Sequence, residues 1–240
     1  SKLCTLTSYG PYPFANFKVM VNEIKKKINK YSRENVAATA QKHLENLVSE
    51  MVFLYLKKYK KNNVYLAGGV FSNVKLNQMI AEKISKLNYP KLKLVVHPGM
   101  SDCGLSVGCS LYSDNYKKRI KPNNYYLGSN LNKNEIRDAL VNNNIKFYKP
   151  KFLDNEVAQI INAGKIIALC RGRMEYGPRA LGNRSIIYHT ADVSVNKWLN
   201  KKLSRTEFMP FAPVSISDDV NKYYNLPKNI DIGECLKYMT

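Results

Sequence analysis

Apolar residues recur every three or four positions between Glu34 and Lys60, and this spacing predicts one long helix. The predicted buried face comprises Val36, Leu44, Leu47, Val48, Met51, Leu54 and Tyr55. His43 falls within the same segment, and we interpret it as an ordinary helix residue. The pair Asn62-Asn63 breaks the pattern, so we expect the helix to end just before it.

The next fifty residues alternate between strand and helix patterns. Residues 64–67 predict a short buried strand that ends at two glycines, and a helical pattern then continues to about residue 84. Residues 92–97 predict a second strand, and a helix is expected from Ser101-Asp102 to about residue 111. The order of strand, helix, strand and helix indicates α/β packing.

A second α/β unit is predicted after a polar, basic stretch at residues 113–124, which we interpret as a linker. We therefore expect one domain over residues 1–112 and another over residues 125–240. Within the second, helices are predicted at 133–143, 154–163 and 194–203, and strands at 145–148, 165–170, 186–188 and 211–216.

The charge balance favours an anionic partner. Lys and Arg number 38 against 18 Asp and Glu, which leaves a net charge of +20. Nucleotide, phosphate, nucleic acid and acidic lipid all fit that charge. A composition bias of the source explains it equally well, because the chain is also rich in Asn, Ile and Tyr.

The five cysteines are odd in number, scattered and without a CxxC pair, so they suggest neither a disulfide framework nor a thiolate zinc site and fit free thiols in a reducing cytoplasm. No apolar run reaches the roughly 18 residues of a membrane helix, so we expect no membrane partner.

Two short motifs lie at strand-to-helix junctions in the first half. LAGGVFSN (66–73) places Gly68 and Gly69 where backbone N–H groups can approach a nucleotide, although a tight turn with Ser72 or Asn73 capping the helix is the simpler interpretation. HPGMSDCGLSVG (97–108) places Asp102 at the start of a helix, as a cap or as a metal ligand. Spacing alone favours the cap.

A third motif, RGRMEYGPRALGNRS (171–185), is far more specific. Its four arginines are Arg171, Arg173, Arg179 and Arg184, and they alternate with Gly172, Gly177 and Gly182. Guanidinium groups match phosphate geometry, and glycines let the backbone wrap closely around an anion. The motif therefore predicts a polyphosphate pocket, in which Glu175 orients one of the arginines.

These motifs resemble those of the carbamoyltransferase family that includes the nodulation, cephamycin and tobramycin enzymes (NodU/CmcH type). GRMEYGPRALGNRSI resembles that family's hallmark motif, LAGGVFSN its AGGVALN segment, MSDCGLSVGCSL its GDAGTALGAAL segment, and RTEFMPFAPV its block ending in PFAP. The matches occur in the family's order and cover about residues 41–214. The resemblance implies the end of an actin- and sugar-kinase-like domain followed by a YrdC-like α/β domain.

The resemblance also implies an activity. The YrdC-like domain would form carbamoyl adenylate from carbamoyl phosphate and ATP with Mg²⁺, and the other domain would pass the carbamoyl group to a hydroxyl of a small-molecule acceptor. A homodimer is possible, and a nucleic-acid partner is not expected. One alternative is a related enzyme, a threonylcarbamoyl-adenylate or tRNA-modifying protein. The other alternative, of a different class, is a basic nucleic-acid-binding module.

Residue roles follow by position. Arg173, Arg179 and Arg184 would be catalytic. Binding of substrate and ATP would fall to Arg171, Gly172, Glu175, Asn183, Ser185, Arg205, Gly68, Gly69 and Asn73. Asp102 would bind iron or another divalent metal, whose histidine ligands the family carries upstream of this chain.

Two features depart from the family pattern. Met209 stands where many members have an arginine. The chain also stops at Thr240, before the family's HxDGTxR-like stretch, so we expect the chain alone not to complete the reaction.

Overall fold

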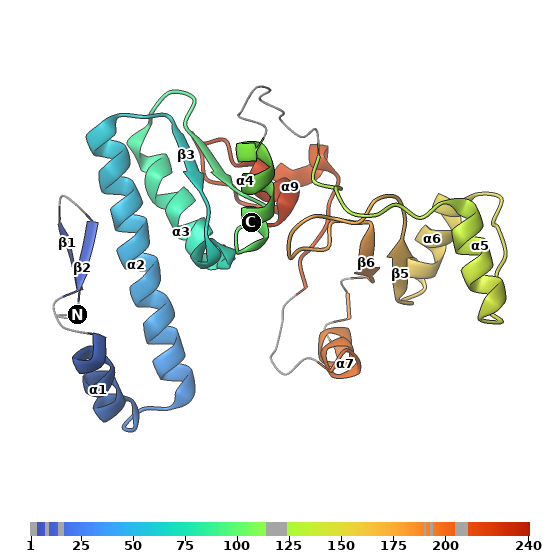
Figure 1. The fold of residues 1–240 in the computed structure, drawn as a ribbon, viewed down its shortest axis with the longest axis horizontal. Coiled ribbons are helices and arrows are strands. Elements are labelled where there is room, and N and C mark those ends of the chain that lie inside the picture. Colours follow the sequence, from blue (N-terminus) through green and yellow to red (C-terminus); the bar gives the residue numbers. More distant parts are fainter. Residues whose placement is uncertain are drawn as a thin grey trace. The chain divides into compact units, whose positions relative to one another are not determined.

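The structure, a computed structural model, describes residues 4–7, 10–13, 17–113, 124–189, 191–192, 194–204 and 211–240 (Figure 1). The chain forms two compact units. Unit 1 comprises Ser1–Val107 together with Asn225–Thr240, and unit 2 comprises Gly108–Tyr224. The predicted second domain ran to residue 240, whereas the structure assigns the last segment to unit 1. Residues 114–123 of the predicted linker lie outside the described residues.

Unit 1 contains helices packed on a small parallel sheet. Its strands β3 and β4 pair in parallel with Leu66 opposite Val96, while β1 and β2 form a separate antiparallel pair. The elements are β1 (Cys4–Thr7), β2 (Gly10–Pro13), α1 (Phe17–Ile28), α2 (Arg33–Tyr59), β3 (Asn63–Leu66), α3 (Val74–Ile84), β4 (Lys93–Val96), α4 (Cys103–Ser113, which runs on into unit 2) and α9 (Gly233–Tyr238). The helices and strands predicted between residues 34 and 111 are therefore confirmed.

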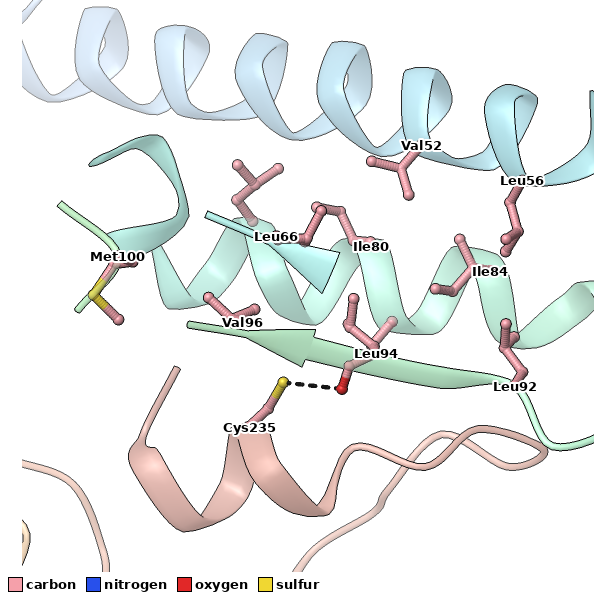
Figure 2. Close-up of a cluster of buried hydrophobic side chains, with 12 residues drawn as sticks. Val52, Leu56, Leu66, Ile80, Ile84, Leu92, Leu94, Val96, Met100 and Cys235 are labelled. Carbon is pink, nitrogen blue, oxygen red and sulfur yellow. Dashed lines mark hydrogen bonds between the residues drawn. The ribbon is translucent and has the colours of Figure 1, made fainter. Parts of the chain in front are cut away.

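The core of unit 1 lies between α2, α3 and β4 (Figure 2). Leu76, Ile80 and Ile84 on α3 are fully buried, and Leu94 and Val96 on β4 pack against them. The spacing of these α3 residues by four along the helix explains why a single face is buried. This core fixes the strand ends from which the Gly68-Gly69 turn begins.

The predicted buried face of α2 is partly wrong. The fully buried residues of α2 are Glu45, Ser49, Val52 and Leu56, whereas the predicted Leu44 and Val48 are partly buried and pack against the core. Leu54, which was assigned to the buried face, is 42% exposed. Because α2 carries apolar side chains around much of its circumference, spacing alone could not select the face that meets α3.

The C-terminal segment extends the unit 1 sheet beyond β4. The backbone N–H of Leu94 donates to the Asp231 carbonyl at 3.0 Å, and the Asp231 N–H donates to the Leu92 carbonyl at 2.8 Å. Lys93 also pairs with the Asp231 carboxylate at 3.3 Å. From α9, the buried thiol of Cys235 points at the Leu94 carbonyl, 3.5 Å away (Figure 2).

This docking predicts a pattern of cysteine reactivity. Burial raises the pKa of the Cys235 thiol, and only the thiolate is nucleophilic. Cys103, Cys109 and Cys170 are exposed. We expect brief alkylation near neutral pH, mapped by mass spectrometry, to modify these three and spare Cys235 until denaturant is added. Equal modification of Cys235 in the native protein would contradict the docking of the C-terminal segment.

Unit 2 is built around an antiparallel pair of strands and several short helices. Its elements are α5 (Lys133–Asn142), α6 (Leu153–Asn162), β5 (Ile167–Cys170), β6 (Arg184–Ile187), α7 (Ser194–Lys202) and α8 (Val220–Tyr223). The predicted helices at 133–143, 154–163 and 194–203 are confirmed. The predicted strands at 145–148 and 211–216 are wrong, because neither segment forms a strand in the structure. Tyr148 is 73% exposed and Ile216 is 70% exposed, so neither segment has the buried face that the pattern suggested.

Candidate anion-binding site

The arginine-rich motif forms the loop that joins β5 to β6. The strand register sets Cys170 opposite Arg184, so the loop begins and ends at the same place. Beyond the last strand pair, the Arg171 N–H donates to the Asn183 carbonyl at 3.0 Å. Gly177 and Gly182 have φ values of 94° and 98°, which residues with a side chain rarely adopt. The glycines therefore allow the turns that bring the arginines onto one short loop.

Glu175 organises this loop from inside. Its side chain is only 8% exposed, and one carboxylate oxygen accepts N–H bonds from Leu181 at 2.8 Å, Asn183 at 2.7 Å and Arg184 at 3.0 Å. Burial raises the pKa of Glu175, but the bonds from the backbone N–H groups lower it by more, and the net pKa lies below its ordinary value. The carboxylate is therefore ionised at neutral pH.

The structure shows the contacts of Glu175, and its predicted role in binding substrate stays a prediction. The sequence suggested that it orients an arginine side chain or contacts substrate. Its carboxylate binds backbone N–H groups, including that of Arg184, and so fixes the path of the chain. The oxygen that accepts these three bonds lies in the interior of the loop, where it shapes the site.

Arg184 ties the two ends of the loop together. Its Nη1 donates to the carbonyls of Arg171 at 2.8 Å, Asn183 at 3.0 Å and Gly172 at 3.3 Å, and its Nη2 donates to Gly172 at 3.3 Å. These bonds place a positive charge beside Gly172, whose φ of 51° turns the backbone at that point. The predicted contact of Arg184 with an anion stays a prediction.

Arg171 and Arg173 are also held by carbonyls. Arg171 Nε donates to Gly182 at 3.1 Å, and Arg173 spans Leu127 and Gly128 through Nη2 and Nε, both at 3.0 Å. Both residues are exposed. Because a guanidinium has five N–H donors, bonds through one or two of them orient the group and leave donors for a ligand.

The remaining predicted residues of this loop serve its internal bonding. The Asn183 side-chain amide donates to the Arg173 carbonyl at 2.7 Å, and the Ser185 hydroxyl accepts from the Gly182 N–H at 2.9 Å. Arg179 is half-buried at the middle of the motif. Arg205 and Met209 lie outside the described residues. The structure thus gathers Arg171, Arg173 and Arg179 on one loop rich in internal hydrogen bonds, with Arg184 at its end as the first residue of β6.

The glycine turn of unit 1 is a separate candidate site. Gly68 has a φ of 106°, and among the described residues no heavy atom lies within 4 Å of where a Cβ would stand at Gly68 or Gly69. The backbone there is open to a ligand, as the sequence predicted for a nucleotide. A nucleotide could come close to the backbone here because neither glycine has a side chain.

Asn73, which the sequence assigned to nucleotide binding, is engaged within unit 1. Its Oδ1 caps α3 by accepting from the Leu76 N–H at 3.1 Å, and its Nδ2 donates to Gln41 Oε1 at 2.7 Å. Gln41 Nε2 in turn donates to Asn73 Oδ1 at 3.2 Å and to the buried Glu45 at 2.9 Å. The capping interpretation describes this residue, and the amide pair also joins α2 to α3.

Asn73 variants separate these roles. Asn73→Ala removes the cap and the partner of Gln41, and we expect it to lower the free energy of unfolding by about 1–3 kcal/mol. Asn73→Ser keeps a capping oxygen and should recover about half of that loss in urea unfolding. Were Asn73→Ser to leave stability intact but abolish ATP binding, Asn73 would be a nucleotide ligand and this account of it would fail.

Asp102 lies immediately before α4 and is exposed. Among the described residues no three His, Cys, Asp or Glu side chains cluster as a metal site requires. These residues alone do not fit the metal implied by the resemblance, so we derive no step through a metal. The metal-ligand role of Asp102 stays a prediction.

Comparison with known proteins matches two sequence families to this chain. Residues 158–240 match the family described as carbamoyltransferase C-terminus, and residues 7–109 match carbamoyltransferase, Kae1-like domain, second subdomain. Together the two matches cover the arginine-rich loop and the glycine turn. The chain belongs to the carbamoyltransferase family.

Individual curated proteins are similar to this chain. An uncharacterised protein of Methanocaldococcus jannaschii is 35% identical over 218 residues, which is 88% of this chain and 40% of the relative. Nodulation protein NolO of Bradyrhizobium diazoefficiens is 28% identical over 203 residues, covering 80% of this chain and 36% of the relative. The 3'-hydroxymethylcephem-O-carbamoyltransferase of Streptomyces clavuligerus is 35% identical over 69 residues, or 29% of this chain and 13% of the relative.

This chain spans well under half the length of these curated relatives. The Kae1-like match agrees with the mixed α/β structure of unit 1. Within the described part of the chain, none of the helices combines the length and apolar character needed to span a bilayer.

Sequence reasoning missed the segment that backs the arginine-rich loop. Gly128 N–H donates to the Met174 carbonyl, and Met174 N–H donates to the Ser129 carbonyl, both at 3.0 Å. A Cβ on Gly128 would stand 2.8 Å from the Met174 Cβ, so only glycine fits there without a shift. The one available signal was Gly128 shortly after the basic linker, and a single glycine does not distinguish such a contact from an ordinary turn.

Proposed function

We propose that this chain is part of an ATP-dependent O-carbamoyltransferase. The proposed enzyme forms carbamoyl adenylate from carbamoyl phosphate and ATP and transfers the carbamoyl group to a hydroxyl of a small-molecule acceptor. The observation that carries the proposal is that the carbamoyltransferase match over residues 158–240 contains a loop with four arginines, fixed from within by an ionised glutamate.

The chemistry explains why such a loop is useful. Forming the adenylate releases inorganic phosphate from carbamoyl phosphate, with the uptake of one water, and pyrophosphate from ATP. The acceptor oxygen then forms a bond to the carbamoyl carbon, AMP leaves, and the hydroxyl proton is released. Negative charge builds up on the phosphates in the first stage, and guanidinium groups that are already held in place stabilise this charge without having to reorganise.

The finer features of this proposal follow the family resemblance. We propose a sugar-kinase-like character for unit 1, a YrdC-like character for unit 2, and Mg²⁺ bound with ATP. The name of the Streptomyces relative, 3'-hydroxymethylcephem-O-carbamoyltransferase, supports a hydroxyl acceptor. A cytoplasmic location and a homodimer belong to the same proposal.

Arg179→Ala tests the proposal in the intact protein. Losing a charge-assisted hydrogen bond to a bound anion costs roughly 1.5–3 kcal/mol, so we expect pyrophosphate release from ATP and carbamoyl phosphate to fall by about one to two decades in kcat/KM. The matched control is Arg137→Ala on α5, which removes an exposed arginine of the same unit. Equal kinetics for wild type and Arg179→Ala would show that Arg179 and its loop are not part of the proposed site.

A further inference from the structure

The stretch that carries Arg179 is anchored at both ends by residues outside the loop. At its start, the Tyr176 N–H donates to the Tyr125 carbonyl at 2.7 Å, and the two tyrosine rings stack with centroids 6.0 Å apart. At its end, the Tyr126 hydroxyl donates to the Leu181 carbonyl at 2.9 Å. Two consecutive tyrosines therefore hold residues 176 and 181, on either side of Arg179.

The peptide groups of Leu181 are fixed from two sides. Its N–H donates to the Glu175 carboxylate at 2.8 Å, and its carbonyl accepts from the Tyr126 hydroxyl. Glu175 also holds the Asn183 and Arg184 N–H groups, so it fixes the chain after Leu181. Tyr126 is the half-buried side chain that fixes the carbonyl two residues after Arg179.

We propose that Tyr126 is a positioning residue of the arginine-rich loop, which acts through Leu181 to place Arg179 against the phosphates of ATP. The inference rests on the proposed function, which it deepens by adding a residue from outside the motif. Residues 124–130 back the same loop through Gly128 and through the Arg173 bonds to Leu127 and Gly128. The bond from the Tyr126 hydroxyl to the Leu181 carbonyl can be removed by deleting one oxygen atom, as Tyr126→Phe does.

Tyr126→Phe in the intact protein is the test, because it removes the hydroxyl and keeps the ring. We expect faster hydrogen exchange in peptides covering 176–184, unchanged exchange in α5, and ATP binding with Mg²⁺ weakened about three- to tenfold, the usual effect of one lost hydrogen bond. The matched control is Tyr223→Phe, an exposed tyrosine of unit 2 that should alter neither measurement.

A double-mutant cycle with Arg179→Ala shows whether Tyr126 acts through that arginine. If it does, Tyr126→Phe weakens ATP binding in the wild type and produces little further loss in the Arg179→Ala background. Equal losses in both backgrounds, or faster loop exchange with unchanged ATP affinity, would overturn the positioning role.

Failure of the proposed function and failure of the positioning role give different results. Wild-type protein that binds ATP but releases no pyrophosphate with carbamoyl phosphate would refute the carbamoyl-adenylate reaction. The coupling between Tyr126 and Arg179 in ATP binding would still stand in that case. Normal pyrophosphate release with no effect of Tyr126→Phe on exchange or affinity would refute the positioning role alone.

Discussion

Replacing Glu175 with alanine is expected to lower the free energy of unfolding of unit 2 by about 3 kcal/mol or more, because three backbone N–H groups lose their acceptor and each unsatisfied group costs roughly 1–3 kcal/mol. Urea unfolding followed by fluorescence of Trp198 measures this loss. Trp198 is the single tryptophan of the chain and lies on α7, within unit 2. Asp138→Ala on the exposed face of α5 is the control and should shift the midpoint little.

Acid is expected to produce part of the same effect in the wild type. The pKa of Glu175 is lowered by folding from its ordinary value of 4.5, so its ionised carboxylate stabilises the folded state above that pH. This contribution is lost as the pH falls through the folded-state pKa. Glu175→Gln keeps the side-chain size without the charge, and its stability difference from wild type should shrink in acid. The role assigned to Glu175 would be contradicted if the stability difference between Glu175→Gln and wild type did not change with pH. It would also be contradicted if Glu175→Ala unfolded at the same urea concentration as wild type.

Replacing Arg184 with alanine is expected to reduce kcat/KM for pyrophosphate release by about a hundredfold or more. The substitution removes a guanidinium that binds the carbonyls of Arg171, Gly172 and Asn183, and each charge-assisted bond contributes roughly 1.5–3 kcal/mol. Both the shape of the loop and one of its positive charges are lost together. Steady-state kinetics of the intact protein measure the loss of activity, and urea unfolding followed by Trp198 fluorescence measures the loss of stability.

Arg184→Lys distinguishes the shape of this side chain from its charge. A lysine ammonium is a point charge that cannot reproduce the planar fork of arginine, so we expect the lysine variant to be nearly as impaired as the alanine variant. Arg137→Lys on α5 is the control. Wild-type kinetics for Arg184→Lys would show that charge alone matters and that the bonds to the loop carbonyls do not.

The regular elements around the sites could be predicted because local patterns determine them. The apolar spacing between residues 34 and 60 predicted α2 to within one residue of its observed bounds, Arg33–Tyr59. The strand at 145–148 failed, because an alternating pattern marks a strand only when a neighbouring strand is present to pair with it. The docking of Asn225–Thr240 on β4 is a contact between distant parts of the chain, and no local pattern encodes it.

The position of the arginine-rich loop could be predicted from the sequence, but the partners of its side chains could not. Composition and glycine spacing predicted a loop for anions around Arg171–Ser185. They did not show that Glu175 would bind backbone N–H groups, or that Arg184 would bind carbonyls, because such partners depend on the path of the folded loop. Asn73 illustrates the same limit, since Gln41, its partner, lies 32 residues earlier in the chain.

We propose that the loop organised by Glu175 binds the phosphates of ATP. Hydrogen exchange of the intact protein, measured with and without ATP, Mg²⁺ and carbamoyl phosphate, tests this claim most directly. We expect slower exchange in peptides covering 171–187 on addition of the ligands, little change in α5, and loss of the effect in Arg179→Ala. Unchanged exchange across 171–187, while pyrophosphate is being released, would contradict it.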